Sequence, residues 1–203
     1  MQAPDTANFV LANFIRVASL LSPEVREAAA RSVLCWLATA DDAGQPSVSP
    51  KEVFAAFDAT HLVVANIASP TRVRNVKRNP RVCMSFIDVF VQKGFKIMGN
   101  ARNVTKDDVE FPVWSAPLMA KAGPRFPIHS VLVIEAFAVE PVIAPSYRLY
   151  AGETTEESQI ASAMRTYGVR PAHGDMYCSP LDGRLPADDP PSVKHASQPA
   201  KDR

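Results

Sequence analysis

Five cationic side chains fall within fifteen residues, in the segment A-S-P-T-R-V-R-N-V-K-R-N-P-R-V at 68–82. The whole chain is almost neutral, with 22 Lys and Arg against 21 Asp and Glu. No Asp or Glu occurs between Ala59 and Ile87, so these cations have no carboxylate nearby in the sequence. Such a stretch is typical either of an anion-binding site or of the solvated face of a surface helix. The residues alone leave both interpretations open.

The same stretch predicts a short helix from Ser69 to Asn79. Ser69 can cap its N-terminus, Pro70 suits the first helical position, and Asn79 precedes a proline that ends the helix. A helix N-terminus carries about +0.5 charge, so a cation there is unfavourable by about 0.3–1 kcal/mol. Arg72 departs from this preference. The conflict disappears if an anion such as phosphate binds where the free N–H groups, the hydroxyls and the guanidinium converge.

The elements that must position this helix are mostly strands. Short apolar runs and turn signals predict six strands, at 33–37, 46–54, 61–66, 81–87, 93–104 and 131–139. Short links between them favour an antiparallel barrel over alternating β-α-β units. Further helices are predicted at 6–21, after Ser22-Pro23-Glu24, at 105–121, and after a capping box at Thr154-x-x-Glu157. The expected fold is mainly β, a six-stranded antiparallel split barrel with flanking helices.

Length and composition predict one core, because the 203 residues are 47% apolar. We expect one domain over 1–170 and a proline-rich arm or disordered tail over 171–203. The net charge of +1 gives no reason to expect a nucleic-acid partner. The sequence shows no membrane-spanning segment or signal peptide, and its three cysteines are widely separated, so a cytoplasmic protein is expected. The scattered histidines predict no metal site.

Four segments resemble the pyridoxamine 5′-phosphate oxidase-like superfamily of FMN-binding split barrels. They are P-S-V-S-P-K at 46–51, L-V-V-A-N at 62–66, S-P-T-R-V-R-N-V-K-R-N-P-R-V at 69–82 and G-F-K-I-M-G-N-A at 94–101. The likeness covers residues 22 to about 140, nearly the whole predicted barrel. It implies a homodimer with FMN at the subunit interface.

The resemblance also implies a set of cofactor-binding residues. Val48 and Ser49 would offer backbone groups to the flavin ring, Asn66 would lie beside the ribityl chain, the phosphate would be held by Lys51, Ser69, Thr71 and Arg72, and Lys93 and Gly94 would approach the ring from the other subunit.

Two of these residues also have structural interpretations. Lys51 shares a strand face with Ser47 and Ser49, and an apolar core would not tolerate this row of polar side chains. It is either a phosphate ligand or a surface lysine along the barrel. Asn66 is either a ligand contact or an Asn that stabilises the turn after a strand.

The expected function is an FMN-dependent oxidoreductase that acts on an unidentified small molecule, with no catalytic residue assigned. Pyridoxamine phosphate oxidation itself is not expected, because residues 171–203 lack the tryptophan and the Arg-x-His motif of the true oxidases. Thr71 stands where the family has a basic residue. The alternatives are a flavin-binding carrier, electron-transfer or sensor protein without turnover, or a relative that binds haem or deazaflavin F420. Trp114 and Phe126 are candidates for a lid over the flavin or for buried packing.

Overall fold

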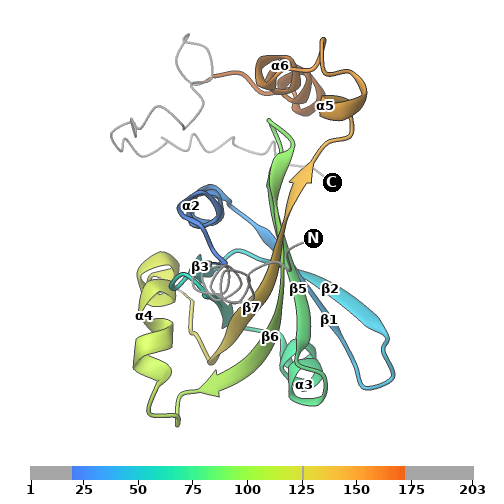
Figure 1. Ribbon diagram of the computed structural model, residues 1–203. Coiled ribbons are helices and arrows are strands. Elements are labelled where there is room, and N and C mark those ends of the chain that lie inside the picture. The colour runs from blue at the N-terminus through green and yellow to red at the C-terminus, as the bar shows by residue number, and fades with distance from the viewer. Residues whose placement is uncertain (1–19, 125, 172–203) are drawn as a thin grey trace, which may run out of the picture. The chain divides into compact units, whose positions relative to one another are not determined.

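The computed structural model describes residues 20–124 and 126–171, and within them the chain folds as an antiparallel sheet flanked by helices (Figure 1). The predicted helix at 6–21 and the predicted tail at 171–203 lie almost wholly outside this range. The strands are β1 (Cys35–Ala40), β2 (Pro46–Lys51), β3 (Phe54–Ala56), β4 (His61–Asn66), β5 (Arg81–Asp88), β6 (Lys93–Thr105) and β7 (Ser130–Ile143). The helices are α2 (Pro23–Arg31), α3 (Pro70–Arg78), α4 (Phe111–Ala122), α5 (Ser146–Leu149) and α6 (Glu156–Tyr167).

The described residues contain seven strands rather than six, because the predicted strand at 46–54 breaks at Glu52 and Val53. The strand order is β2-β1-β5-β6-β7-β4-β3, which places β2 and β3 at opposite edges of one sheet. Lys51 ends β2 and Phe54 begins β3, and three virtual bonds limit their Cα separation to about 11 Å. The two edges therefore meet at this point. The sheet curls into the split barrel that the sequence predicts.

The inner face of the curled sheet holds the larger apolar cluster. Phe54, Phe86 and Leu37 are among its largest fully buried side chains, and α2 and α3 add Val25 and Val76. A second cluster lies on the opposite face, where α4 packs on β3, β4 and β7. Its buried members are Val53, Val63, Ala65, Val104, Leu118, Ile128, Val131 and Val133. The helices thus cover the inner face and one end of the outer face.

The other end of the outer face carries a row of apolar side chains over which no described helix packs. One residue comes from each of five neighbouring strands, and each lies opposite the next in the strand register. We call it the outer row: Val48, Ala38, Cys83, Met98 and Ala138. Val48 is 55% exposed, and the adjacent Trp36 is 48% exposed. Directly opposed residues of antiparallel strands share a face, so the row forms one continuous apolar strip.

Most helix boundaries follow local signals, with one shift. Ser22 Oγ accepts from the Val25 N–H at 3.3 Å and caps α2 as predicted. The reciprocal capping bonds before α6 join Thr155 and Ser158 rather than Thr154 and Glu157. The predicted capping box is therefore wrong by one residue. The Ser158 hydroxyl accepts the backbone N–H bond that the Glu157 carboxylate was expected to accept.

None of the helices in the described ranges has the length and apolar character needed to cross a membrane.

Gly94 on β6 tests how closely the strands approach. A Cβ at this position would lie 2.1 Å from the Phe86 carbonyl oxygen and 2.7 Å from the Ile87 Cα. Both are backbone atoms, so the strands would have to move apart. We expect Gly94→Ala to destabilise the fold by about 1–3 kcal/mol, measured by denaturant unfolding. Gly152→Ala is the matched control, since an added Cβ there meets no atom within 4 Å. Equal stability of the two variants would contradict the close approach.

Candidate functional site

The site forms where β2 runs alongside the N-terminal turn of α3. Alternate residues of β2 point inward, and the burial pattern of the strand shows this alternation. Strand residues two apart are about 6.6 Å apart along the strand, close to the spacing of residues three apart on a helix surface. Hydrogen bonds accordingly join Lys51 to Ser69 and Ser49 to Arg72. The strand and the helix are thus held together by polar contacts.

Lys51 extends across this junction and is only 9% exposed. Its Nζ donates to Ser69 Oγ at 2.7 Å. Burial lowers the pKa of Lys51, and the positive charge of Arg72 lowers it further. No carboxylate forms an ion pair with Lys51 or Arg72 among the described residues. The effect of Arg72 on this pKa shows that the two cations are close enough to repel each other. Neither positive charge is balanced by a described carboxylate.

Arg72 lies on β2 rather than projecting into solvent. Its guanidinium donates to Ser47 Oγ at 2.5 Å, to Ser49 Oγ at 3.1 Å and to the Val48 carbonyl oxygen at 3.3 Å. All three acceptors are uncharged. Three other arginines of the described residues do pair with carboxylates: Arg31 with Glu27, Arg78 with Asp42 and Arg102 with Glu110.

Ser69 occupies the N-cap position of α3, but its side chain makes no capping bond. The prediction that this hydroxyl caps the helix is wrong, because the hydroxyl accepts from Lys51 instead. The Arg72 and Val73 N–H groups both turn back to the Ser69 carbonyl oxygen. Pro70 has no N–H, and Thr71 is exposed with no hydrogen bond to its own N–H among the described residues. One backbone donor and one hydroxyl thus remain open to a ligand at this helix start.

Asn66 shapes the turn between β4 and α3. Its Oδ1 accepts from the Ser69 N–H at 3.1 Å, and its Nδ2 donates to Ser130 Oγ at 2.9 Å. Its carbonyl oxygen also accepts from the His129 N–H. The structure supports the turn role that the sequence left open. Contact with a ribityl chain stays a prediction.

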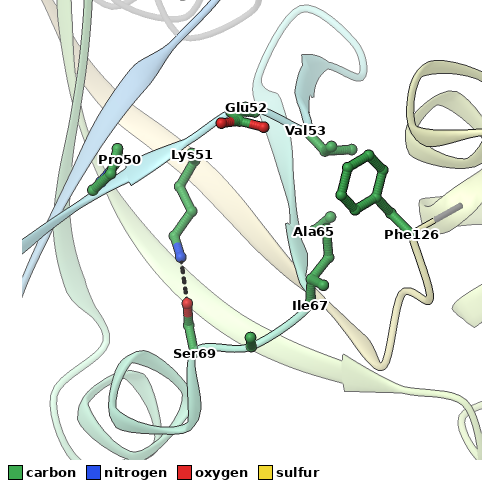
Figure 2. Close-up of a pocket in the computed structure, with 9 residues that line it drawn as sticks. Pro50, Lys51, Glu52, Val53, Ala65, Ile67, Ser69 and Phe126 are labelled. Atoms are coloured by element: carbon green, nitrogen blue, oxygen red, sulfur yellow. Dashed lines mark hydrogen bonds between the residues drawn. The ribbon is translucent and has the colours of Figure 1, made fainter. Parts of the chain in front are cut away.

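A pocket of about 210 Å³ opens beside the Lys51–Ser69 bond. Figure 2 shows Lys51 running from β2 to Ser69 along one side, with the Glu52 carboxylate well away from the ammonium. The remaining walls are mostly apolar, and Phe126 lies at the far side. The lining residues are Pro50, Lys51, Glu52, Val53, Ala65, Ile67, Ala68, Ser69 and Phe126.

Two of the predicted site residues lie apart from this cluster within the single chain. Lys93 donates to Glu156 at 2.6 Å and lies 4.5 Å from the centre of the Tyr147 ring. The Glu156 hydrogen bond raises the pKa of Lys93. Gly94 is buried within the ladder of β5 and β6. No described contact joins either residue to the cations of the site, so their approach to a ligand would require a second copy of the chain.

The two aromatic lid candidates differ in their surroundings. Trp114 donates to Glu110 and packs on Phe57 at 4.4 Å between ring centres, which is the buried-packing alternative. Phe126 does line the pocket and is 41% exposed.

Sequence reasoning missed the hydroxyls that complete the site. Ser47 was recognised as sharing the face of Lys51 but was not assigned a role, and Ser130 was not singled out. Ser69 and Arg72 are three residues apart on the helix and contact Lys51 and Ser49, which are two residues apart on the strand. Ser47 is the next residue on the same strand face, and this spacing could have identified it.

The donor set of the site suits an anion with several oxygen atoms. It combines an ammonium, a guanidinium, hydroxyls and an open N–H at a helix start, and it contains no acid. No group of three or more His, Cys, Asp or Glu side chains in the described residues is arranged to hold a metal ion.

Comparisons with known proteins found a family match and solved structures of similar fold. A family model described as pyridoxamine 5′-phosphate oxidase matches residues 21–143. No curated protein matches the chain.

Several solved structures share the fold. A candidate pyridoxamine 5′-phosphate oxidase from Lactobacillus delbrueckii is similar at a TM-score of 0.50 and 25% identity, over 59% of this chain and 93% of that chain. An FMN-binding protein from Syntrophomonas wolfei is similar at 0.52 and 14%, over 68% of this chain and 97% of that one. HupZ from Group A Streptococcus is similar at 0.52 and 18%, over 61% and 94% respectively.

The uncompensated charge of Lys51 predicts an unusual effect on stability. Lys51→Met removes a buried cation and its repulsion by Arg72, so we expect the ligand-free protein to become more stable. A gain of about 1 kcal/mol would raise Tm by roughly 2–4 °C in a chain of this size.

The pH dependence of this gain has a definite sign. The pKa of Lys51 in the folded protein lies below its ordinary value of 10.5, so the unfolded chain binds more protons between the two values. The stability advantage of Lys51→Met should therefore be full below the lowered pKa and should narrow as the pH rises through that pKa toward 10.5. Lys77→Met, on the exposed face of α3, is the control and should change Tm little. Destabilisation by Lys51→Met at neutral pH would show that the lysine is compensated.

Proposed function

Because the chain belongs to the pyridoxamine 5′-phosphate oxidase family, whose model spans more than half of it, we propose that it binds FMN and acts as an FMN-dependent oxidoreductase on a small molecule. The observation that carries this proposal is the pair of uncompensated cations, Lys51 and Arg72, at the start of α3. A phosphate monoester carries a charge of about −1.5 to −2 at pH 7, which would neutralise both cations at once. The likeness to an FMN-binding protein of the same fold is consistent with this ligand.

The proposed roles are those that the family resemblance implies. Lys51, Ser69, Thr71 and Arg72 would hold the phosphate; Lys51 donates to Ser69 at the start of α3, and Thr71 and Arg72 belong to the first turn of this helix. Asn66 would lie beside the ribityl chain while it holds the turn that presents Ser69.

The ring would lie along β2. This strand is an edge of the sheet, so backbone groups on its side away from β1 have no strand partner. Val48 and Ser49 would offer such groups to the isoalloxazine. Bound FMN would supply the electron transfer, and the chain would supply orientation and access. The pocket beside Lys51, with Phe126 at its far side, is the proposed approach for a small apolar substrate.

A homodimer is part of the proposal. The outer row forms an apolar strip with no described helix over it, and such surfaces on soluble proteins usually mark an interface. The row begins at Val48, between the two serines that hold Arg72. A second copy over this strip would therefore lie next to the proposed flavin site, and it would bring Lys93 and Gly94 toward the ring. The proposed location is the cytoplasm, on the evidence of three separated cysteines.

The phosphate assignment is tested by Arg72→Ala. Loss of a charge-assisted hydrogen bond should weaken FMN affinity by about 1.5–3 kcal/mol, measured by titration of the apoprotein with FMN. Arg74→Ala, two positions further along α3 and exposed, is the control and should bind FMN almost normally. Unchanged affinity in Arg72→Ala would remove the phosphate assignment.

Turnover is a separate question from binding, and two measurements address it. The absorbance spectrum of freshly purified protein should show a flavin band, whereas a Soret band would indicate haem. Stopped-flow mixing of the holoprotein with NADH or NADPH should then bleach the flavin, and a small acceptor should reoxidise it. A bound flavin that stays inert to both donors and to a range of acceptors would favour a carrier or sensor protein.

The dimer is tested by a charge placed in the outer row. The protein should elute at about twice its 22.1 kDa mass. Met98→Glu should shift it toward the monomer, because an unpaired carboxylate would be buried in the interface. Val109→Glu is the matched control, since Val109 is 96% exposed and lies outside the row. A wild-type protein that stays monomeric with FMN bound would contradict the dimer.

A further inference from the structure

Ser47 and Ser49 hold the Arg72 side chain in a way that leaves it able to bind a ligand. The guanidinium spends three hydrogen bonds on β2, at 2.5, 3.1 and 3.3 Å. Arginine has about five N–H donors, so some remain for another partner. Each serine accepts through a lone pair, which leaves its own hydroxyl proton free to donate. The contacts fix the position of the arginine without neutralising its charge.

A purely structural role explains these bonds less well. Elsewhere in the described fold, Arg78 pairs with Asp42, Arg102 pairs with Glu110 and Arg81 lies over the Phe137 ring, whereas the side chain of Arg72 meets only neutral oxygen acceptors. A carboxylate at 47 or 49 would have relieved the repulsion between Arg72 and Lys51. The chain instead has serine at both positions. A serine hydroxyl carries no charge, so it does not neutralise Arg72, and the charge of Arg72 still lowers the pKa of Lys51.

We infer that Ser47 and Ser49 are positioning residues, which hold Arg72 beside Lys51 so that the site selects a terminal phosphate monoester over a flavin without one. The inference rests on the proposed function and deepens it. Neither serine side chain needs to touch the flavin ring for this effect. Their contribution should therefore appear only with ligands that carry the phosphate.

The test compares FMN with riboflavin, which lacks the phosphate. In the variant Ser47→Ala, FMN affinity should fall roughly tenfold, while riboflavin affinity stays unchanged. Quenching of flavin fluorescence gives both dissociation constants. The conservative variant Ser47→Thr keeps the hydroxyl that accepts from Arg72 and should restore most of the preference for FMN. Thermal melts of all variants establish that they fold.

The outcomes separate the inference from the proposed function. An equal loss for FMN and riboflavin would show that the serines only support the strand, and an unchanged FMN affinity would also overturn the inference. If the wild-type protein binds no flavin, the proposed function fails, and inorganic phosphate becomes the probe. Stabilisation of the wild type by phosphate, reduced in the alanine variant, would then still support the positioning role. No effect of phosphate on either protein would overturn it.

Discussion

Lys51 and Arg72 repel each other at the start of α3, and no described carboxylate forms an ion pair with either of them. The protein bears this cost at a place where hydroxyl and backbone oxygens are the available acceptors. Such neutral partners orient a cation but do not satisfy its charge. The two unpaired charges therefore support the proposal that an anion from outside the chain, such as the phosphate of FMN, completes the electrostatic balance of the site.

The sheet topology is what brings these charges together. β2 and β3 are consecutive in sequence but lie at opposite edges of the sheet, so the chain must cross between them in two residues. Lys51 is the last residue before that crossing, and its neighbourhood includes both edges. The turn after β4, held by Asn66, then delivers Ser69 to the lysine ammonium. A cation on the flat part of the sheet could not have met a helix N-terminus in this way.

The sequence predicted most of the fold because the strands carry local signals. The bounds of α3, β5 and β6 agree with prediction to within one residue at each end. It failed at the break at Glu52 and Val53, since residues 46–54 contain no Gly, Asn or Asp that would mark a turn at the crossing. It also failed for the Ser69 hydroxyl, because a capping signal is local whereas the Lys51 bond spans eighteen positions. The cations of the site were recognisable from sequence, and Ser49 was expected to offer its backbone, but the hydrogen bonds from Arg72 to the Ser47 and Ser49 hydroxyls were not predicted.

The crossing at Glu52 and Val53 has a further consequence for how the protein behaves at high concentration. An open sheet exposes a row of unpaired N–H and C=O groups at each edge, and these groups can recruit strands from other molecules. Here the break leaves β3 only three residues long, and Pro46 and Pro50 remove two N–H donors from β2 at the other edge. Both edges therefore offer few backbone donors on which intermolecular β-pairing and aggregation could begin.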